Sequence, residues 1–133
     1  MSEKELHFDK ELFFQALGDT TRLRLLNLMG DEELCVCNLV EVLGQSQPKI
    51  SRHLAYLRRA GVVEGRREGK WMHYRITPPR DNGAAKLLRK TLKWLADDPL
   101  MQADRARLTK AVCPPAELVA ITPAPDVRTR KAR

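Results

Sequence analysis

Long hydrophobic runs, an apolar leader and enzyme signatures are all missing from this chain of 133 residues. No stretch approaches the roughly 20 consecutive apolar residues of a membrane span. The first residues, MSEKELHFDKEL, mix acidic and basic side chains and lack the apolar region of a signal peptide. The sequence contains no glycine-rich phosphate loop, no pair of catalytic carboxylates and no nucleophile–base set. We therefore expect a cytoplasmic protein that has no membrane partner and is not an enzyme.

Cysteine and histidine are scarce, with three residues of each. So few cysteines without an export signal do not build a disulfide framework. What is present is a hydrophobic fraction of 43%, enough for one compact domain with a core. From Cys113 onward the sequence is rich in proline and ends in basic residues. We expect one folded domain over residues 1–112 and a flexible basic tail over residues 113–133.

Positive charge is concentrated in the middle of the chain. The net charge is +7 overall, but residues 1–46 carry more acidic than basic side chains. Residues 47–76 hold eight Lys and Arg and two Glu, a net charge of +6. Such a block is the electrostatic footprint of a phosphate-binding surface, although a solvated basic face would look similar.

Hydrophobic spacing and capping residues predict a mainly helical protein. We expect helices over 9–18, 19–30, 31–44, 47–60, 82–97 and 99–110, the third of which begins near Asp31–Glu33. Ser46 is a suitable N-cap for the fourth helix, with Pro48 in its first turn. Residues 62–76 alternate around a Glu-Gly-Lys turn and predict a β-hairpin. A basic hairpin directly after a basic-faced helix indicates a winged helix-turn-helix.

In that motif the second helix lies in the major groove, and dimers usually read palindromic DNA. Gln47 can pair with adenine and Arg52 with guanine, whereas Lys49 and Ser51 suit phosphates. Apolar surfaces on the first helix and on helix 82–97 could form a homodimer through these terminal helices. The predicted DNA-binding residues are Gln47, Pro48, Lys49, Ser51, Arg52, Tyr56 and Arg59 on the helix, and Arg66, Arg67 and Lys70 on the hairpin.

Two stretches, ALGDTTRLRLLNLM and ELCVCNLVEVLGQSQPKISRHLAYLRRAGVVEGRREGKWMHYRI, resemble the ArsR/SmtB family of metal-responsive repressors. The similarity runs over about residues 8–95 and four consecutive elements. It implies a homodimeric winged-helix repressor that leaves its operator when metal binds. It also implies that Gln47, Pro48, Ser51 and Arg52 face the DNA. We interpret His53, in the pattern HL-x-x-L, as a helix-flank or core residue.

Within this family, ELCVC resembles the arsenic box of arsenite-responsive members. Soft thiolates select thiophilic metals and metalloids, so the resemblance implies arsenic(III) or antimony(III) as inducer and no catalytic cofactor. The usual box is C-x-C-x-x-C, but Val40 occupies its third position here. Three interpretations remain open for the last thiol, Cys113: a third ligand from the same or the partner subunit, a bystander beside a two-coordinate site, or an incidental loop residue. The candidate ligands are Cys35, Cys37 and Cys113.

The spacing of Cys35 and Cys37 raises a geometric problem. Positions i and i+2 of a regular helix lie about 200° apart, so two helical cysteines could not hold one atom. We therefore expect metalloid binding to distort the first turn of their helix, or to use a turn that is already frayed, and so misplace residues 47–52. Buried packing remains the alternative for this pair.

The chain lacks the ligand patterns of the family's other metal sensors. The family's zinc sensors place Asp, His and Glu ligands on the final helix, where this chain has no histidine. Its cadmium/lead sensors use cysteine from an N-terminal arm, and the corresponding residues 1–34 of this chain contain no cysteine. A thiol-redox-responsive winged-helix repressor without a metal ligand is the alternative function. A constitutive nucleoid-type DNA binder is a further alternative.

Overall fold

The computed structural model describes residues 7–110, so the predicted tail from Cys113 lies outside the described residues. Six helices occur in this range: α2 (Lys10–Leu17), α3 (Thr20–Met29), α4 (Val36–Leu43), α5 (Gln47–Arg59), α6 (Asn82–Leu95) and α7 (Pro99–Lys110). The strands are β1 (Leu34–Cys35), β2 (Val63–Glu68) and β3 (Trp71–Ile76). The predicted winged helix-turn-helix is confirmed.

The helix ends follow local rules. Asp9, Asp19, Ser46 and Asp81 cap α2, α3, α5 and α6, each accepting a hydrogen bond from a backbone N–H three residues later. Gly44, at the end of α4, has the left-handed backbone that glycine adopts without steric cost. This residue lets the chain turn sharply into α5.

One predicted boundary is wrong. The helix expected from Asp31–Glu33 begins only at Val36, and residues 34 and 35 form β1 instead. β1 pairs antiparallel with β3, so the hairpin gains a third strand in the order β1-β3-β2. The hydrogen bonds that this edge makes with β3 outweigh the weak tendency of the first residues to extend the helix.

The core lies between the helices and one face of the sheet. Ile50, Leu54 and Leu57 of α5 are completely buried, which confirms the predicted stripe. Leu25, Leu26 and Leu28 of α3 pack in the same cluster with Leu39 and Val40 of α4. Burial on this scale stabilises the fold by roughly 1.5–3 kcal/mol per large side chain. The core thereby fixes the exposed face of α5.

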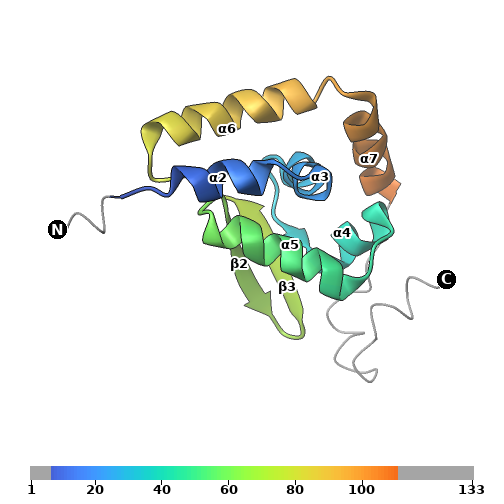
Figure 1. The fold of residues 1–133 in the computed structure, drawn as a ribbon. Coiled ribbons are helices and arrows are strands. Elements are labelled where there is room, and N and C mark those ends of the chain that lie inside the picture. The colour runs from blue at the N-terminus through green and yellow to red at the C-terminus, as the bar shows by residue number, and fades with distance from the viewer. Residues whose placement is uncertain (1–6, 111–133) are drawn as a thin grey trace.

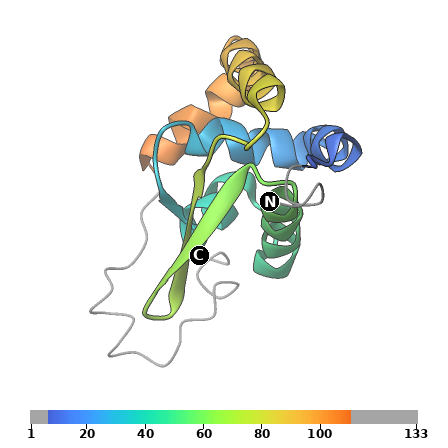
Figure 2. The ribbon, with the colours of Figure 1, turned by 90° about the vertical axis from the view of Figure 1, so that its left-hand side faces the viewer.

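α6 and the β2–β3 hairpin lie at opposite ends of the molecule (Figure 1). α6 crosses one end above α2 and α3, while α5 and the β2–β3 hairpin lie at the other end, and α7 descends beside α3 and α4 (Figure 1). Turned by 90°, the hairpin projects away from the helices (Figure 2). None of the helices between residues 7 and 110 combines the length and apolar character that a bilayer crossing needs.

Candidate nucleic-acid interface and cysteine site

The N-terminal end of α5 presents polar side chains on its exposed side. Pro48, Lys49 and Arg52 are exposed. Gln47 and Ser51 are half-buried and hydrogen-bonded to each other, with Gln47 Nε2 donating to Ser51 Oγ at 2.7 Å. This bond holds the Gln47 amide against the next turn of α5. The structure therefore brings the five predicted residues of the first turns together on one surface.

Tyr56, a predicted DNA contact, is half-buried and contacts other helices. Its ring stacks under the guanidinium of Arg22 at 4.1 Å and under that of Arg59 at 4.9 Å. Its hydroxyl donates to Gln15 Oε1 at 3.1 Å. Tyr56 thus connects α5 to the C-terminal end of α2. Of the two arginines that pack on its ring, Arg59 is exposed and Arg22 is half-buried.

Arg22 is a residue that sequence reasoning missed. Its guanidinium donates to the carbonyls of Ala16 and Gln15, both at 2.9 Å, and so caps the end of α2. It also lies 3.2 Å from His53 Nδ1. Partial burial is the main cause that lowers the pKa of His53, although Asp19 opposes the shift. No local sequence pattern marks such a contact, because its partners lie on other helices.

On the hairpin, the three predicted cations differ in their surroundings. Arg66 lies in mid-strand opposite His73 and donates to both carboxylate oxygens of Glu33, at 2.6 and 3.1 Å. This bond also lowers the pKa of Glu33. Arg67 and Lys70 are exposed near the turn at Gly69, where the positive φ suits glycine. The tip therefore presents Arg67 and Lys70, while Arg66 fastens β2 to the segment before β1.

The two cysteines lie where β1 meets α4. Cys35 is extended, with φ −73° and ψ 144°, and serves as the N-cap of α4. The backbone N–H of Cys37 points toward Cys35 Sγ, with N and S 3.5 Å apart. Both residues are nearly buried, at 9% and 5% exposure. The expectation that both thiols lie on one helical turn is wrong, because Cys35 precedes the helix and no turn needs to unwind for the two sulfurs to approach.

Cys35 also faces the hairpin, since it pairs with His73 of β3 in the sheet register. Opposite residues of antiparallel strands have Cβ atoms about 4.5–5.5 Å apart, so the two side chains share one face of the sheet. Cys37 is disulfide-bonded in this structure. Cys113 lies outside the described residues, and within residues 7–110 no group of three His, Cys, Asp or Glu side chains is placed to hold a metal ion.

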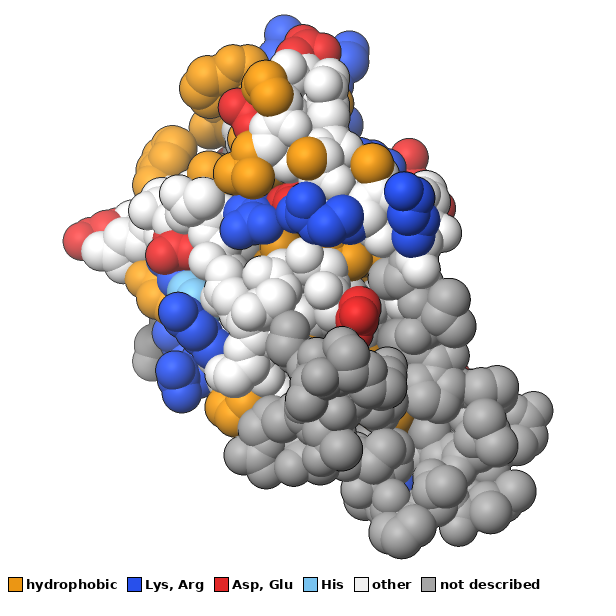
Figure 3. Space-filling model, turned by 90° about the vertical axis from the view of Figure 1, so that its right-hand side faces the viewer, with side chains coloured by type: hydrophobic (Ala, Val, Ile, Leu, Met, Phe, Trp, Pro, Cys, Tyr) orange, Lys and Arg blue, Asp and Glu red, His pale blue; other side chains and the backbone are white. Residues whose placement is uncertain are grey.

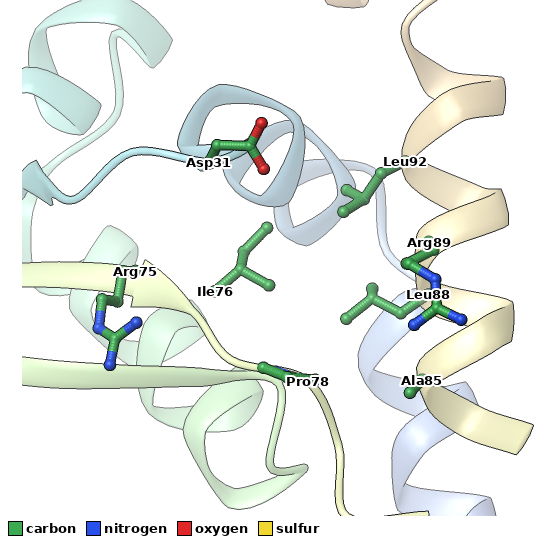
Figure 4. Close-up of a pocket in the computed structure, with 9 residues that line it drawn as sticks. Asp31, Arg75, Ile76, Pro78, Ala85, Leu88, Arg89 and Leu92 are labelled. Carbon is green, nitrogen blue, oxygen red and sulfur yellow. The ribbon is translucent and has the colours of Figure 1, made fainter. Parts of the chain in front are cut away.

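A half-open cavity of about 310 Å³ lies elsewhere, between α6, the end of α3 and the end of β3. Ile76, Leu88 and Leu92 point into it, with Asp31 and Arg89 at its rim (Figure 4). Neither cysteine lines this cavity, and no α5 residue does. It is therefore separate from both candidate sites.

Comparison with known proteins gives consistent matches. Residues 19–65 match the family described as "Bacterial regulatory protein, arsR family". The chain is 44% identical over 101 residues to the "Arsenical resistance operon repressor" of Escherichia coli (strain K12), covering 75% of this chain and 85% of the relative. This family and this relative are transcriptional regulators rather than enzymes.

Two solved structures share the fold. A homodimeric winged helix-turn-helix DNA-binding domain from Mycobacterium bovis has a TM-score of 0.56 and 28% identity, covering 77% of this chain and 93% of that one. The AntR antimony-specific transcriptional repressor has a TM-score of 0.52 and 29% identity, covering 66% and 78% of the two chains. The chain belongs to the ArsR family of bacterial regulatory proteins.

Proposed function

We propose that this chain is a metalloid-responsive transcriptional repressor, released from operator DNA when trivalent arsenic or antimony binds its cysteine thiolates. The observation that carries this proposal is the position of Cys35 and Cys37. Cys35 belongs to a strand that pairs with the hairpin, and Cys37 lies in the first turn of the helix that leads into α5. The names of the arsenical repressor of E. coli and of the antimony-specific repressor support the same inducer class.

The DNA-binding surface comprises the start of α5 and the tip of the hairpin. Arg52 is the candidate for a bidentate contact to guanine, and Gln47, once rotated from Ser51, for one to adenine. Pro48, Lys49, Ser51 and Arg59 would position the helix, and Arg67 and Lys70 would contact phosphates beside it. Arg66, which is exposed although it pairs with Glu33, and Tyr56, which packs against Arg22 and donates to Gln15, lie beside this surface as further candidate contacts.

A homodimer would present two such surfaces to a palindromic operator. Large apolar side chains are exposed on α6, at the end of the molecule away from α5 and the hairpin, and on α2, which lies between α6 and α5 (Figure 1). Trp94 of α6 is 76% exposed, and Leu87 and Phe14 are about half exposed. In the space-filling view hydrophobic side chains gather on one side of that end, with charged side chains next to them (Figure 3). The M. bovis domain, which is described as homodimeric, supports a dimer as such.

The metalloid site would consist of the thiolates of Cys35, Cys37 and Cys113. Soft sulfur donors bind a soft metalloid more strongly than hard oxygen or nitrogen donors do. The third position of the usual box is Val40, which has no donor atom, so Cys113 supplies the only further thiol in the chain. Because Cys37 is disulfide-bonded here, binding requires the reduced protein.

The test is release of a fluorescent operator duplex by arsenite, followed by anisotropy at fixed salt in the presence of a phosphine reductant. Wild type and Cys113→Ser are compared, with Cys35→Ser as the variant lacking the proposed junction ligand. We expect release of wild type, weaker release of Cys113→Ser and none of Cys35→Ser. Equal release of wild type and Cys113→Ser would reduce the site to two thiolates. If arsenite fails to release the wild type, the metalloid proposal is wrong.

The disulfide at Cys37 favours one second candidate, a repressor that responds to thiol oxidation without a metal ligand. In that case peroxide would release the operator and a dithiol would restore binding, whereas arsenite under reducing conditions would have no effect. The same anisotropy assay separates the two functions.

A further inference from the structure

The cavity between α6, the end of α3 and the end of β3 continues into a wider hollow along α6, with a volume of about 730 Å³. The two hollows share four lining residues, which are Gly30, Asp31, Arg89 and Leu92. They therefore form one continuous hollow, the α6 groove. Small-molecule sites in proteins have volumes of about 300–1,000 Å³. The α6 groove is thus large enough for a small organic ligand.

α6 contributes an apolar stripe and a basic stripe to this groove. Leu88 and Leu92 are four positions apart and so share one face of the helix. Leu88 is buried, and the two leucines form an apolar floor together with Ile76 of β3 (Figure 4). Arg89 and Lys93 each follow one of the leucines by one position, so cations run along the edge of this floor. A ligand on the apolar floor would therefore meet positive charge at its side.

The charge of the lining is one-sided. Its Lys and Arg side chains outnumber its carboxylates by five to one. Arg75 is paired with Glu64. The other four cations are exposed and form no ion pair with any carboxylate of residues 7–110; they are Lys86, Arg89, Lys90 and Lys93. Because a guanidinium can bind a carboxylate through two parallel hydrogen bonds, Arg89 is the best-suited anchor for an anionic group.

The α6 groove lies on a different side of the helix from the apolar side chains proposed for the dimer. Leu87 precedes Arg89 by two positions, which places it about 200° away around the helix. Trp94 follows Arg89 by five positions and lies about 140° away. A dimer formed through Leu87 and Trp94 would therefore leave the basic stripe accessible.

We propose that the α6 groove binds a small organic anion in which one anionic group is joined to an apolar ring or chain. The apolar part would lie on Ile76, Leu88 and Leu92, and the anionic group would contact Arg89 and Lys93. An inorganic anion would leave the apolar floor in water, and an uncharged apolar molecule would leave the cations without a partner. Neither cysteine of the described residues lines the groove, so this site is independent of the metalloid proposal.

The experiment uses anilinonaphthalene sulfonate as the probe, because it joins one sulfonate to an apolar ring system and fluoresces when it leaves water. Fluorescence titration of the full-length reduced protein measures its dissociation constant. Phenylnaphthylamine has the same rings without the sulfonate, and sodium sulfate, measured as a competitor at matched ionic strength, has the anionic group without the rings. We expect the sulfonate probe to bind at least about tenfold more tightly than either, since it alone uses both the floor and the cations.

Two matched variants test the role of the basic stripe. Arg89→Gln should weaken binding of the sulfonate probe at least about fivefold and leave that of phenylnaphthylamine unchanged, because the two probes differ in the charged group. Arg80→Gln removes an exposed arginine that precedes α6 and does not line the groove, so it should change neither affinity. Both are surface substitutions that keep the fold, which thermal unfolding verifies. Equal losses in the two variants, or equal affinities of the two probes, overturn the proposal.

Methyl NMR spectra locate the bound probe. The sulfonate probe should shift the methyl signals of Ile76, Leu88 and Leu92 and leave that of Ile50, in the core beneath α5, unchanged. Shifts confined to Leu87 would place the probe on the exposed apolar face of α6 instead and would overturn the proposal, as would the absence of saturable binding.

Discussion

The buried carboxylate of Asp104 allows a quantitative prediction about what holds α7 in place. Asp104→Ala removes the acceptor for Arg24 and Arg107, whose guanidiniums are 18% and 49% exposed as side chains. The matched control is Glu64→Ala, which removes the partner of Arg75 in a pair whose two side chains are about half exposed. Both substitutions delete one carboxylate, but Asp104 is fully buried and pairs with two arginines, whereas Glu64 is half exposed and pairs with one.

The expected magnitudes differ because water can replace the lost partner in only one case. Removing one member of a buried pair destabilises by about 3–5 kcal/mol. Arg107 reaches solvent and Arg24 does so in part, so we take the lower end, about 3 kcal/mol. An exposed pair contributes about 0.2–1 kcal/mol, so Glu64→Ala should lower the free energy of unfolding by less than about 1 kcal/mol.

Urea unfolding followed by circular dichroism, at one protomer concentration, measures both values. With a slope of about 2 kcal/mol/M, Asp104→Ala should lower the midpoint by about 1.5 M and Glu64→Ala by less than about 0.5 M. Arg24→Ala in both backgrounds completes a double-mutant cycle. A coupling below about 1 kcal/mol, or equal midpoints for the two alanine variants, would refute the reasoning that a buried ion pair holds α7 on α3.

Three other measurements follow from the same structure. Burial lowers the pKa of His53 below its ordinary 6.5, so the unfolded chain binds this proton more readily than the folded one. The contribution of His53 to stability is therefore present above about pH 6.5 and is lost as pH falls. His53→Gln should reduce this loss, as measured by unfolding curves recorded over a range of acidic pH. Arg52→Ala should weaken operator binding by about 1–3 kcal/mol and relax base preference. Arg58→Ala, on the same helix, should change the operator affinity little in DNA titrations at the same salt concentration. Equal losses of affinity would contradict the assignment of Arg52 to the DNA-binding face. Trp94→Glu should shift sedimentation toward monomer, and an unchanged dimer would place the interface elsewhere.

The helices could be predicted from sequence because their signals are local. Ile50, Leu54 and Leu57 repeat at helical spacing, and Ser46 caps the helix as expected. The strand β1 could not be predicted in this way, since two residues have no measurable period. Its existence depends on hydrogen bonds to β3, whose residues lie far along the chain.

The contacts around the candidate sites were still harder to predict. Asp104 stands in a stretch with two arginines, Asp-Arg-Ala-Arg, which in sequence is typical of a solvated helix face. Its burial arises only when α7 packs on α3 and Arg24 supplies the compensating charge. Tyr56, a predicted DNA contact on the polar side of α5, also packs against Arg22 and donates to Gln15 of α2, two contacts that its sequence position does not reveal. Tertiary partners of this kind leave no trace in local patterning.

The geometry of Cys35 limits how metalloid binding could release DNA. If the metalloid takes up Cys35 Sγ, the cap that this sulfur provides to Cys37 N–H is lost. Losing a good N-cap costs about 0.5–2 kcal/mol, and sulfur is a weak acceptor, so the lower end applies. A hundredfold release, however, requires a coupling of about 2.8 kcal/mol. The cap alone therefore cannot account for induction of that size, and the second connection of Cys35, its pairing with β3, must carry much of the effect into the hairpin.

A shortened hairpin lacking the tip cations Arg67 and Lys70 should then lose affinity for the operator and also a large part of its arsenite response. A response that remains complete would place the coupling in α4 and α5 alone.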